Sequence, residues 1–113
     1  MNMKVESHGD ISVVQCGGSL DADSVGAFKK VVGDLVNSGA VRLVIDCAQL
    51  TFVDSMGLGA MISLLRRVRS REGDLKVAAI ADDVKTIFEI TRLHRLFDVC
   101  PDAASACRQF SKK

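Results

Sequence analysis

The sequence predicts one α/β domain, in which about four helices pack on a mixed, largely parallel sheet of about five strands. A single domain over residues 1–113 is expected, because a chain of 113 residues that is 48% hydrophobic can bury a core without metals or disulfides. Runs rich in β-branched residues alternate with helical segments, without a linker, a low-complexity tract or a repeat. Because parallel neighbours need a crossover helix, this alternation indicates a mostly parallel sheet.

The first expected strand covers residues 11–16, which are rich in β-branched side chains. Gly17 and Gly18 follow, and we expect them to form a flexible turn that ends the strand. Residues 3–6 are expected to pair with it as a short edge strand. A helix is predicted from Asp23 to near residues 37–39, where Gly39 supplies the stop, because apolar residues recur at helical spacing, namely Val25, Phe28, Val32, Leu35 and Val36.

The middle of the chain predicts a buried strand and a long helix. Residues 41–46 are almost continuously apolar, which is typical of a strand covered on both faces. A helix over residues 55–72 follows, with an apolar stripe made of Leu58, Met61, Ile62, Leu65 and Val68. Its C-terminal end carries Arg66, Arg67, Arg69 and Arg71. These arginines complement the helix dipole and keep one face solvated, an interpretation favoured over a phosphate-binding or nucleic-acid-binding patch.

The last third of the chain predicts two further pairs of a strand and a helix. Residues 74–80 form the next expected strand. The helix over residues 82–91 has two aspartates at its positive N-terminus and buries Val84, Ile87 and Phe88. Residues 96–99 supply a short strand that Pro101 ends, and Asp102 is expected to cap a terminal helix that buries Ala103, Cys107 and Phe110.

Charge and composition argue against several classes of partner. Lys and Arg number 15 against 14 Asp and Glu, so a net charge of +1 gives no field that would attract nucleic acid or an anionic membrane. Aromatic residues are 4% of the chain and Trp and Tyr are absent, which leaves no stacking platform for bases. No apolar stretch approaches the roughly 18 residues that span a bilayer, and no signal-peptide core follows the N-terminus. We therefore expect a cytoplasmic protein that binds no nucleic acid and does not insert into membranes.

The four cysteines are Cys16, Cys47, Cys100 and Cys107. None forms a C-x-x-C pair or lies beside a histidine at metal-ligand spacing, so no metal site and no disulfide framework is expected. In a reducing compartment such thiols behave as small hydrophobic side chains. No cofactor is expected.

Ser55 is the candidate functional residue, because it lies where the buried strand meets the long helix. In open α/β sheets, functional groups gather where the carboxyl ends of strands meet helix N-termini. If Asp54 or Ser55 is the N-cap, the free N–H groups of the first turn can accommodate an anion there. Phosphorylation would add about −1.5 to −2 charges at this point without unfolding the domain. From the residues alone, a simple capping role is the alternative.

Gly57 and Gly59 lie in the first turns of the same helix, where glycine weakens a helix. They either let a partner's backbone approach Ser55 or allow tight packing of the helix on the sheet, and spacing does not decide between these. A phosphate-binding loop is disfavoured, since the third glycine of a dinucleotide loop and the Gly-Lys-Ser/Thr ending of a P-loop are missing.

The segment from Val53 to Gly59 reads V-D-S-M-G-L-G and follows the strand L-V-I-D. It resembles the D-S-x-G-L-G-type signature of the STAS domain family, specifically of the anti-sigma-factor antagonists. The segment G-S-L-D, which ends at Asp21, is similar to the family's G-x-L-D turn. The order of elements resembles the family from about residue 11 to residue 110.

The resemblance implies a partner switch that regulates transcription. In this family the unmodified domain binds an anti-sigma factor that is also a serine kinase, the kinase phosphorylates the serine, here Ser55, and a serine phosphatase reverses the modification. The resemblance further implies a partner-binding surface around this serine, and its residues here are Asp21, Asp54, Met56, Gly57 and Leu58. Asp21 has a second possible role as the cap of the first helix. Met56 departs from the small residue common in the family, and a role as an apolar contact for the partner is favoured over the alternative of a side chain packed in the core.

Two rival interpretations are weighed. A serine hydrolase needs a G-x-S-x-G turn and a histidine base, but Val53 occupies the place of the first glycine. His8 and His94 lie in segments with no evident link to Ser55 and are expected to be solvated surface residues, so no enzyme is expected. The second rival is a STAS subunit of a signalling scaffold or a lipid-transport system without a sigma-factor target.

Overall fold

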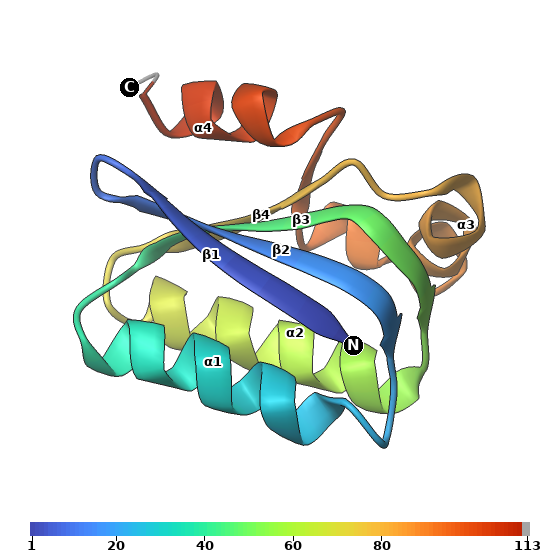
Figure 1. Ribbon diagram of the computed structural model, residues 1–113. Helices are drawn as coiled ribbons and strands as arrows, with labels where there is room; N and C mark the ends of the chain where they lie inside the picture. Colours follow the sequence, from blue (N-terminus) through green and yellow to red (C-terminus); the bar gives the residue numbers. More distant parts are fainter. Residues whose placement is uncertain (112–113) are drawn as a thin grey trace.

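The structure is a computed structural model that describes residues 1–111 (Figure 1). Its elements, in chain order, are β1 (Asn2–His8), β2 (Ile11–Leu20), α1 (Val25–Asn37), β3 (Arg42–Val53), α2 (Ser55–Arg69), β4 (Asp74–Ala78), α3 (Asp82–Ile90), the short 3-10 helix η1 (Leu93–Arg95), β5 (Asp98–Cys100) and α4 (Ala103–Ser111). The predicted alternation of strands and helices is confirmed.

The five strands form one sheet in the order β1-β2-β3-β4-β5. β1 and β2 are antiparallel, whereas the pairs β2–β3, β3–β4 and β4–β5 are parallel. Gly9 and Asp10 form the two-residue turn of the β1–β2 hairpin, and Gly9 has a φ of +66°, which glycine adopts without strain. The predicted mixed, largely parallel sheet is therefore confirmed.

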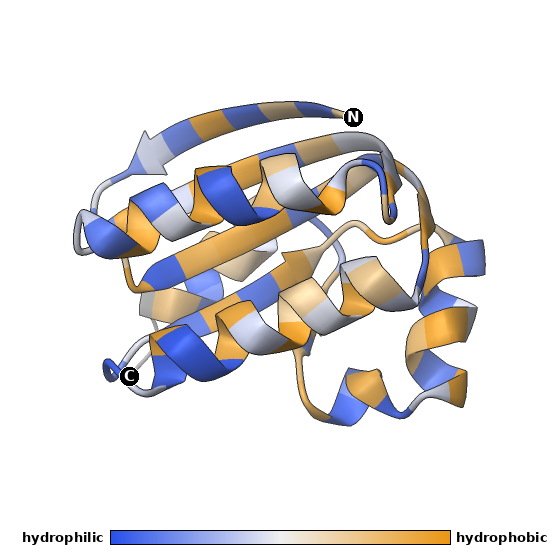
Figure 2. Cartoon of the chain, turned by 90° about the horizontal axis from the view of Figure 1, so that it is seen from below, coloured by the Kyte–Doolittle hydropathy of each residue, from blue (hydrophilic) through white to orange (hydrophobic). Residues whose placement is uncertain are grey.

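Helices cover both faces of the sheet (Figure 1). α1 and α2 lie on one face, where their apolar stripes form the larger part of the core with the inner residues of β2, β3 and β4. α4 lies on the other face over a smaller cluster that joins Val44, Ala78, Ala106 and Phe110. Figure 2, seen from the α1 and α2 side, shows hydrophobic and hydrophilic residues alternating around both helices, as expected for helices with one buried face.

Three strands are longer than predicted, and the first of them, β1, covers Asn2–His8 rather than residues 3–6. β2 does not stop at Gly17 and Gly18 but continues to Leu20, and β3 continues past residue 46 to Val53. The two extensions pair with each other, and the register shifts between Gln15 and Gly17 and again between Gly18 and Ser19. Gly18 has a φ of +88°. The glycines therefore accommodate an irregularity inside the strand, a role that glycine often has in strands, instead of ending it.

Several other predicted limits change by a few residues. α1 begins at Val25 rather than Asp23, α2 ends at Arg69, α3 ends at Ile90, and β4 ends at Ala78. The last strand is Asp98–Cys100 rather than residues 96–99, because η1 and the turn after it occupy the preceding positions. In α2, Leu58 and Ile62 are only half-buried, and Leu64 is a core residue that the predicted stripe omitted.

The predicted cap of α4 is confirmed. The Asp102 carboxylate accepts a hydrogen bond of 2.7 Å from the N–H of Ser105, and this bond lowers the pKa of the Asp102 carboxyl. The helix buries Phe110 as expected. Ala106 is also buried, whereas Ala103 and Cys107 are half-buried, so the apolar face of α4 is centred one position away from the prediction.

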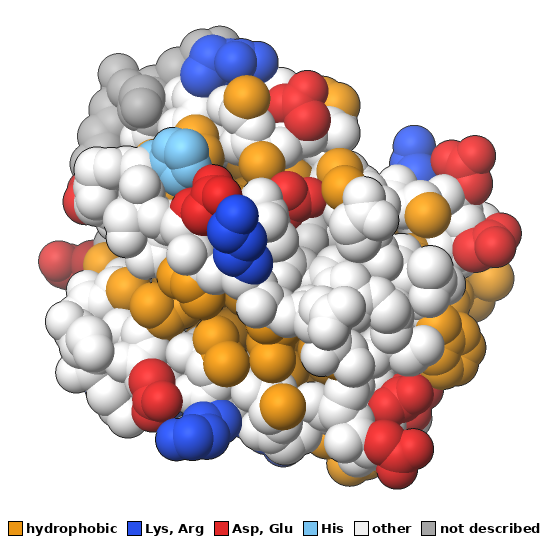
Figure 3. All heavy atoms as spheres, in the orientation of Figure 1, with side chains coloured by type: hydrophobic (Ala, Val, Ile, Leu, Met, Phe, Trp, Pro, Cys, Tyr) orange, Lys and Arg blue, Asp and Glu red, His pale blue; other side chains and the backbone are white. Residues whose placement is uncertain are grey.

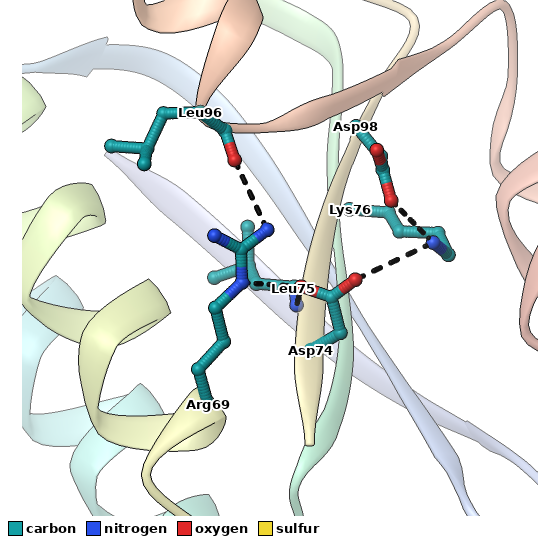
Figure 4. A network of polar contacts seen from close by, with 6 residues as sticks. All are labelled: Arg69, Asp74, Leu75, Lys76, Leu96 and Asp98. Carbon is teal, nitrogen blue, oxygen red and sulfur yellow. Dashed lines mark hydrogen bonds and ion pairs between the residues drawn. The ribbon is translucent and has the colours of Figure 1, made fainter. Parts of the chain in front are cut away.

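Arg67 and Arg69 of α2, and Arg71 shortly after its end, join this helix to its neighbours. Arg69 donates from Nε to Asp74 and from Nη2 to the carbonyl of Leu96, at 3.1 Å in both cases (Figure 4). Arg67 bonds to the side-chain oxygen of Asn37, and Arg71 bonds to the carbonyl of Val36 at 2.9 Å, both at the end of α1. The preference for a structural explanation over a ligand-binding patch agrees with these contacts.

Candidate functional site

The candidate site is the N-terminus of α2, which the sheet holds firmly in place. β3 ends at Val53, which pairs with Leu20 of β2, and the N–H of Asp54 donates to the carbonyl of Leu20 at 3.1 Å. α2 begins one residue later at Ser55. The helix therefore starts directly beside the paired ends of β2 and β3, which is the strand-to-helix junction that the sequence predicted.

Asp54 is the N-cap of α2 and also fixes the neighbouring loop. Its Oδ1 accepts from the N–H of Gly57 at 2.9 Å, which satisfies one of the free amides of the first turn. Its Oδ2 accepts from the N–H of Ala22 at 3.1 Å, in the loop between β2 and α1. One carboxylate thus joins two segments, and the sequence left open whether Asp54 or Ser55 would be the cap.

Ser55 is the first residue of α2 and is exposed. Within the described part of the chain its hydroxyl has no hydrogen-bond partner, and the N–H groups of Ser55 and Met56 have no backbone acceptor. No acidic residue lies in the first turn of the helix. This arrangement gives an accessible hydroxyl next to free amides and the positive end of a helix dipole, so it can accommodate an added anion.

Gly57 and Gly59 have different surroundings. Gly57 is buried, and a Cβ there would lie 2.5 Å from the carbonyl oxygen of Leu20 and 3.0 Å from a methyl group of Val53. Gly59 is exposed, and a Cβ there would meet nothing within 4 Å. Tight packing therefore explains Gly57, which supports the site from beneath, whereas Gly59 leaves open surface along the helix.

Asp21 lies in the loop that Asp54 holds beside α2. Its Oδ1 accepts from the N–H groups of Asp23 at 3.0 Å and Ser24 at 3.2 Å, so the carboxylate shapes the turn that precedes α1. Ser24 is the N-cap residue of α1 but makes no side-chain cap bond, and its hydroxyl instead donates to the carbonyl of Ser19 at 2.7 Å. The structure thus places Asp21 near the start of both helices, on a loop that is well supported.

Two large apolar side chains are exposed close to Ser55 in the sequence. Met56 is 51% exposed and Phe52 is 48% exposed. Leu58 is half-buried. Phe52 was missed in the sequence analysis, although its position next to the buried Val53 in a strand would place its side chain on the opposite face. Exposed apolar residues around a polar centre are typical of a surface that binds another protein.

Residues 1–111 show no evidence of a metal site, a histidine base for Ser55 or a membrane-spanning helix. No group of three or more His, Cys, Asp or Glu side chains there could hold a metal ion. His8 contacts Glu6, and the Nδ1 atom of His94 lies 3.2 Å from the carbonyl of Phe88, so neither is hydrogen bonded to Ser55. No described helix has both the length and the hydrophobicity to cross a membrane.

The pKa values of Cys16, Cys47 and Cys100 are raised, whereas catalytic cysteines have lowered ones. Burial raises the pKa of Cys16 to about 12, and the nearby Asp46 carboxylate adds to this effect. Burial also raises the pKa of Cys47, with smaller contributions from Cys16 and Asp46, and burial raises the pKa of Cys100. These groups stay protonated at neutral pH and act as small apolar side chains, as the sequence suggested.

The mixed, largely parallel sheet with its crossover helices, and the exposed Ser55 directly after the Asp54 cap, are the features expected of a STAS domain from the resemblance. A family model for the STAS domain matches residues 2–106, and the chain therefore belongs to this family. Its relatives include the anti-sigma-B factor antagonist of Staphylococcus epidermidis, which is 27% identical over 101 residues that make up 88% of this chain and 94% of that protein.

Solved structures show the same fold. An anti-sigma factor antagonist from Mycobacterium paratuberculosis superposes with a TM-score of 0.88 at 25% identity, covering 96% of this chain and 92% of that one. The phosphorylated form of the Bacillus cell fate determinant SpoIIAA gives a TM-score of 0.77 at 17% identity, with coverage of 96% and 99%. The predicted STAS fold is confirmed by these matches.

Proposed function

We propose that this chain is an anti-sigma-factor antagonist that regulates transcription by partner switching. In its unmodified form it binds an anti-sigma factor that is also a serine kinase. Phosphorylation of Ser55 by that kinase releases it, and a serine phosphatase restores the binding form. The observation that carries the proposal is the exposed Ser55 hydroxyl at the capped N-terminus of α2. The partner class implies action in the cytoplasm.

The relatives add support to this proposal. The protein of Staphylococcus epidermidis is named an anti-sigma-B factor antagonist, and SpoIIAA has been solved in a phosphorylated form. Both align with nearly the whole of this chain. A switch of the same kind would need an acceptor hydroxyl on a stable surface, and Ser55 meets that requirement.

A phosphate on Ser55 is compatible with the folded domain. The N–H groups of Ser55 and Met56 are free to donate to it, and the helix dipole favours a negative charge at this end. The Asp54 carboxylate is the nearest opposing charge in the sequence, but both of its oxygens already accept backbone hydrogen bonds. We therefore expect phosphorylation to change the surface while the fold is retained.

The same phosphate would oppose binding of a partner. It would bring about −1.5 to −2 charges next to Asp54, in the segment that carries the exposed side chains of Phe52 and Met56. In a complex these apolar groups would be removed from water, and a charge buried among them without a counter-ion is strongly unfavourable. Since about 1.4 kcal/mol corresponds to a tenfold change in affinity, one phosphate is sufficient to switch partners.

We assign the partner-binding surface to residues around Ser55. Met56 supplies the central apolar contact, Leu58 lies half-buried on the same helix, and Asp21 and Asp54 hold the adjacent loop. Gly57 contributes indirectly, because it allows α2 to pack closely against Leu20 and so positions the surface. Phe52 extends the surface along β3.

The test is affinity capture from the native host combined with mass spectrometry of the captured chain. Wild type, Ser55→Ala and Ser55→Asp are compared, and Ser63→Ala is the matched control because Ser63 is an exposed serine on the same helix. We expect a phosphate on Ser55 of the wild type, retained binding of a kinase by Ser55→Ala and Ser63→Ala, and loss of that kinase by Ser55→Asp.

The proposal fails if Ser55 is never modified and all four proteins retain the same partners. Capture of a signalling scaffold or a lipid-transport component, with no anti-sigma factor among the partners, would instead support the alternative role of a STAS subunit in another complex. The two results are distinguished by the identity of the captured proteins.

A further inference from the structure

β1 presents an open edge of the sheet. On one side it pairs with β2 along its whole length, from Asn2 opposite Gly17 to His8 opposite Ile11. It is the terminal strand of the sheet, and no described element lies along its other side. Figure 2 shows β1 at the rim of the molecule, beyond α1. An edge of this kind offers a row of backbone donors and acceptors to another strand.

The register identifies which backbone groups of β1 face outward. In a hairpin with a two-residue turn, the residues that flank the turn, here His8 and Ile11, form a hydrogen-bonded pair. Such pairs alternate along an antiparallel ladder, so even-numbered residues of β1 bond to β2. The N–H and C=O groups of Met3, Val5 and Ser7 therefore point away from the sheet.

Two residues of opposite charge, Lys4 and Glu6, lie between the residues whose backbone groups face outward. Lys4 and Glu6 share one face of β1, with Nζ and Oε1 3.5 Å apart, and their side chains are 72% and 39% exposed. Figure 3 shows acidic and basic side chains next to each other on the face that includes β1, with hydrophobic side chains gathered nearby. Val5 is 40% exposed on the other face of the strand.

We infer that two copies of this chain pair through β1, antiparallel and centred on Val5, to form one sheet that runs through both copies. In this register Val5 is opposite Val5 of the second copy, and Met3 is opposite Ser7. These are the positions whose backbone groups face outward, so each pair exchanges two hydrogen bonds. Lys4 then lies opposite Glu6 of the second copy, twice by symmetry.

The charges select this register over its neighbours. Residues that are directly opposite in an antiparallel pair lie on the same face of the sheet. The neighbouring registers of the two β1 strands are therefore those in which the symmetry axis passes through Lys4 or Glu6 instead of Val5. A centre at Lys4 would place the two Lys4 ammonium groups opposite each other, and a centre at Glu6 would do the same for the two carboxylates. Only the centre at Val5 pairs Lys4 with Glu6, and it does so in a non-hydrogen-bonded pair, where side chains are closest.

A lysine on an edge strand ordinarily opposes edge pairing. Here that effect is offset because each Lys4 would face a carboxylate. The apolar contribution is small, since Val5 is the main apolar side chain at the centre of the junction. The pairing should therefore be reversible and depend on protein concentration, which is typical of small interfaces.

Sedimentation velocity over a range of concentrations up to the millimolar tests this inference. We expect a reversible monomer–dimer equilibrium for the wild type. Lys4→Glu and Glu6→Lys should each raise the dissociation constant at least about tenfold, because two opposite-charge pairs become like-charge pairs at once. An equimolar mixture of the two variants should form a heterodimer, since each carboxylate introduced at position 4 would face a lysine introduced at position 6.

Two further variants separate pairing from folding. Val5→Pro removes an outward N–H from the centre of the junction but none of the bonds to β2, so it should abolish the dimer while circular dichroism shows a folded domain. Lys85→Glu makes the same charge change as Lys4→Glu on α3, and the dimer should persist. A wild type that stays monomeric at every concentration, or a dimer that is unaffected by the charge variants and Val5→Pro, would overturn the inference.

Discussion

The two ends of α2 are anchored in different ways. At the C-terminal end, long arginine side chains reach Asn37, Val36, Asp74 and Leu96, and all of these contacts except the one with Val36 are exposed. Figure 4 shows the contacts of Arg69 with Asp74 and Leu96. At the N-terminal end, one short carboxylate and a glycine fix the helix through backbone contacts. The first arrangement engages the side chains of Arg67, Arg69 and Arg71 in contacts, whereas the second leaves the side chain of Ser55 available.

The difference shows how an accessible side chain can lie on a rigid support. Flexible surface ion pairs contribute little to stability and hold a helix loosely. A capped N-terminus that packs directly on the strand ends contributes more per contact, because the cap satisfies a helix amide that has no intrahelical acceptor.

The largest effect is expected at Gly57. Gly57→Ala should lower the free energy of unfolding by about 1–3 kcal/mol, because the new methyl group would overlap the backbone of Leu20. Gly59→Ala is the matched control and should raise it by up to about 1 kcal/mol, since the position is open and alanine favours the helix. Urea denaturation of both variants measures the two changes, and equal effects would contradict the packing role of Gly57.

Removal of the Asp54 carboxylate should have the next largest effect. Asp54→Ala should lower the free energy of unfolding by about 0.5–2 kcal/mol, because the amides of Gly57 and Ala22 both lose their acceptor. Asp54→Asn keeps one carbonyl oxygen and should lose less. Hydrogen exchange at Ala22 gives the specific measurement, since this amide should exchange faster in both variants, and unchanged exchange would argue against the link between the two segments.

At the other end of the helix, the expected change is smaller. Arg69→Ala should lower the free energy of unfolding by about 0.5–1 kcal/mol, because it removes a partly exposed ion pair with Asp74 and a bond to Leu96. Arg66→Ala removes a charge from the same turn, but the described structure shows no bond from that side chain, so little change is expected. If Arg69→Ala lowered the free energy of unfolding more than Asp54→Ala does, the C-terminal end of α2 would be the more firmly anchored one.

The smallest effect on stability is expected at Ser55. Ser55→Ala should change the free energy of unfolding by less than about 0.5 kcal/mol, because the hydroxyl makes no hydrogen bond within residues 1–111. Thermal and urea denaturation of this variant beside wild type provide the measurement. A clear loss of stability would show that Ser55 has a structural role, and its proposed function would then need a different explanation.

The sequence predicted the fold well because hydrophobic periodicity is a local signal. The spacing from Val25 to Val36 and the apolar run before Asp46 identified α1 and the core of β3, and the start of α2 was predicted at the observed residue. The extensions of β2 and β3 were missed because Gly17 and Gly18 are typical of turns. Their role inside the strand depends on pairing with residues that lie about thirty positions away, which the local pattern does not reveal.

The candidate site was only partly predictable for the same reason. The motif and the junction identified Ser55 and its cap, and the resemblance placed Asp21 on a nearby loop. The bond from Ala22 to Asp54 and the close approach of Leu20 to Gly57 both arise from the tertiary structure. The sequence alone did not decide whether Gly57 and Gly59 serve tight packing or partner access. The three-dimensional surroundings distinguish them, because only Gly57 packs closely against Leu20.

The link between Ala22 and Asp54 has a consequence for the newly synthesised chain. The two residues are 32 positions apart, and they meet only after β2 and β3 have paired in parallel. Pairing of strands across such a separation is slow compared with helix formation. A partner that recognises the surface around Ser55 together with this loop would therefore distinguish the completed fold from a nascent or unfolded chain, so the switch proposed at Ser55 would act only on molecules that have finished folding.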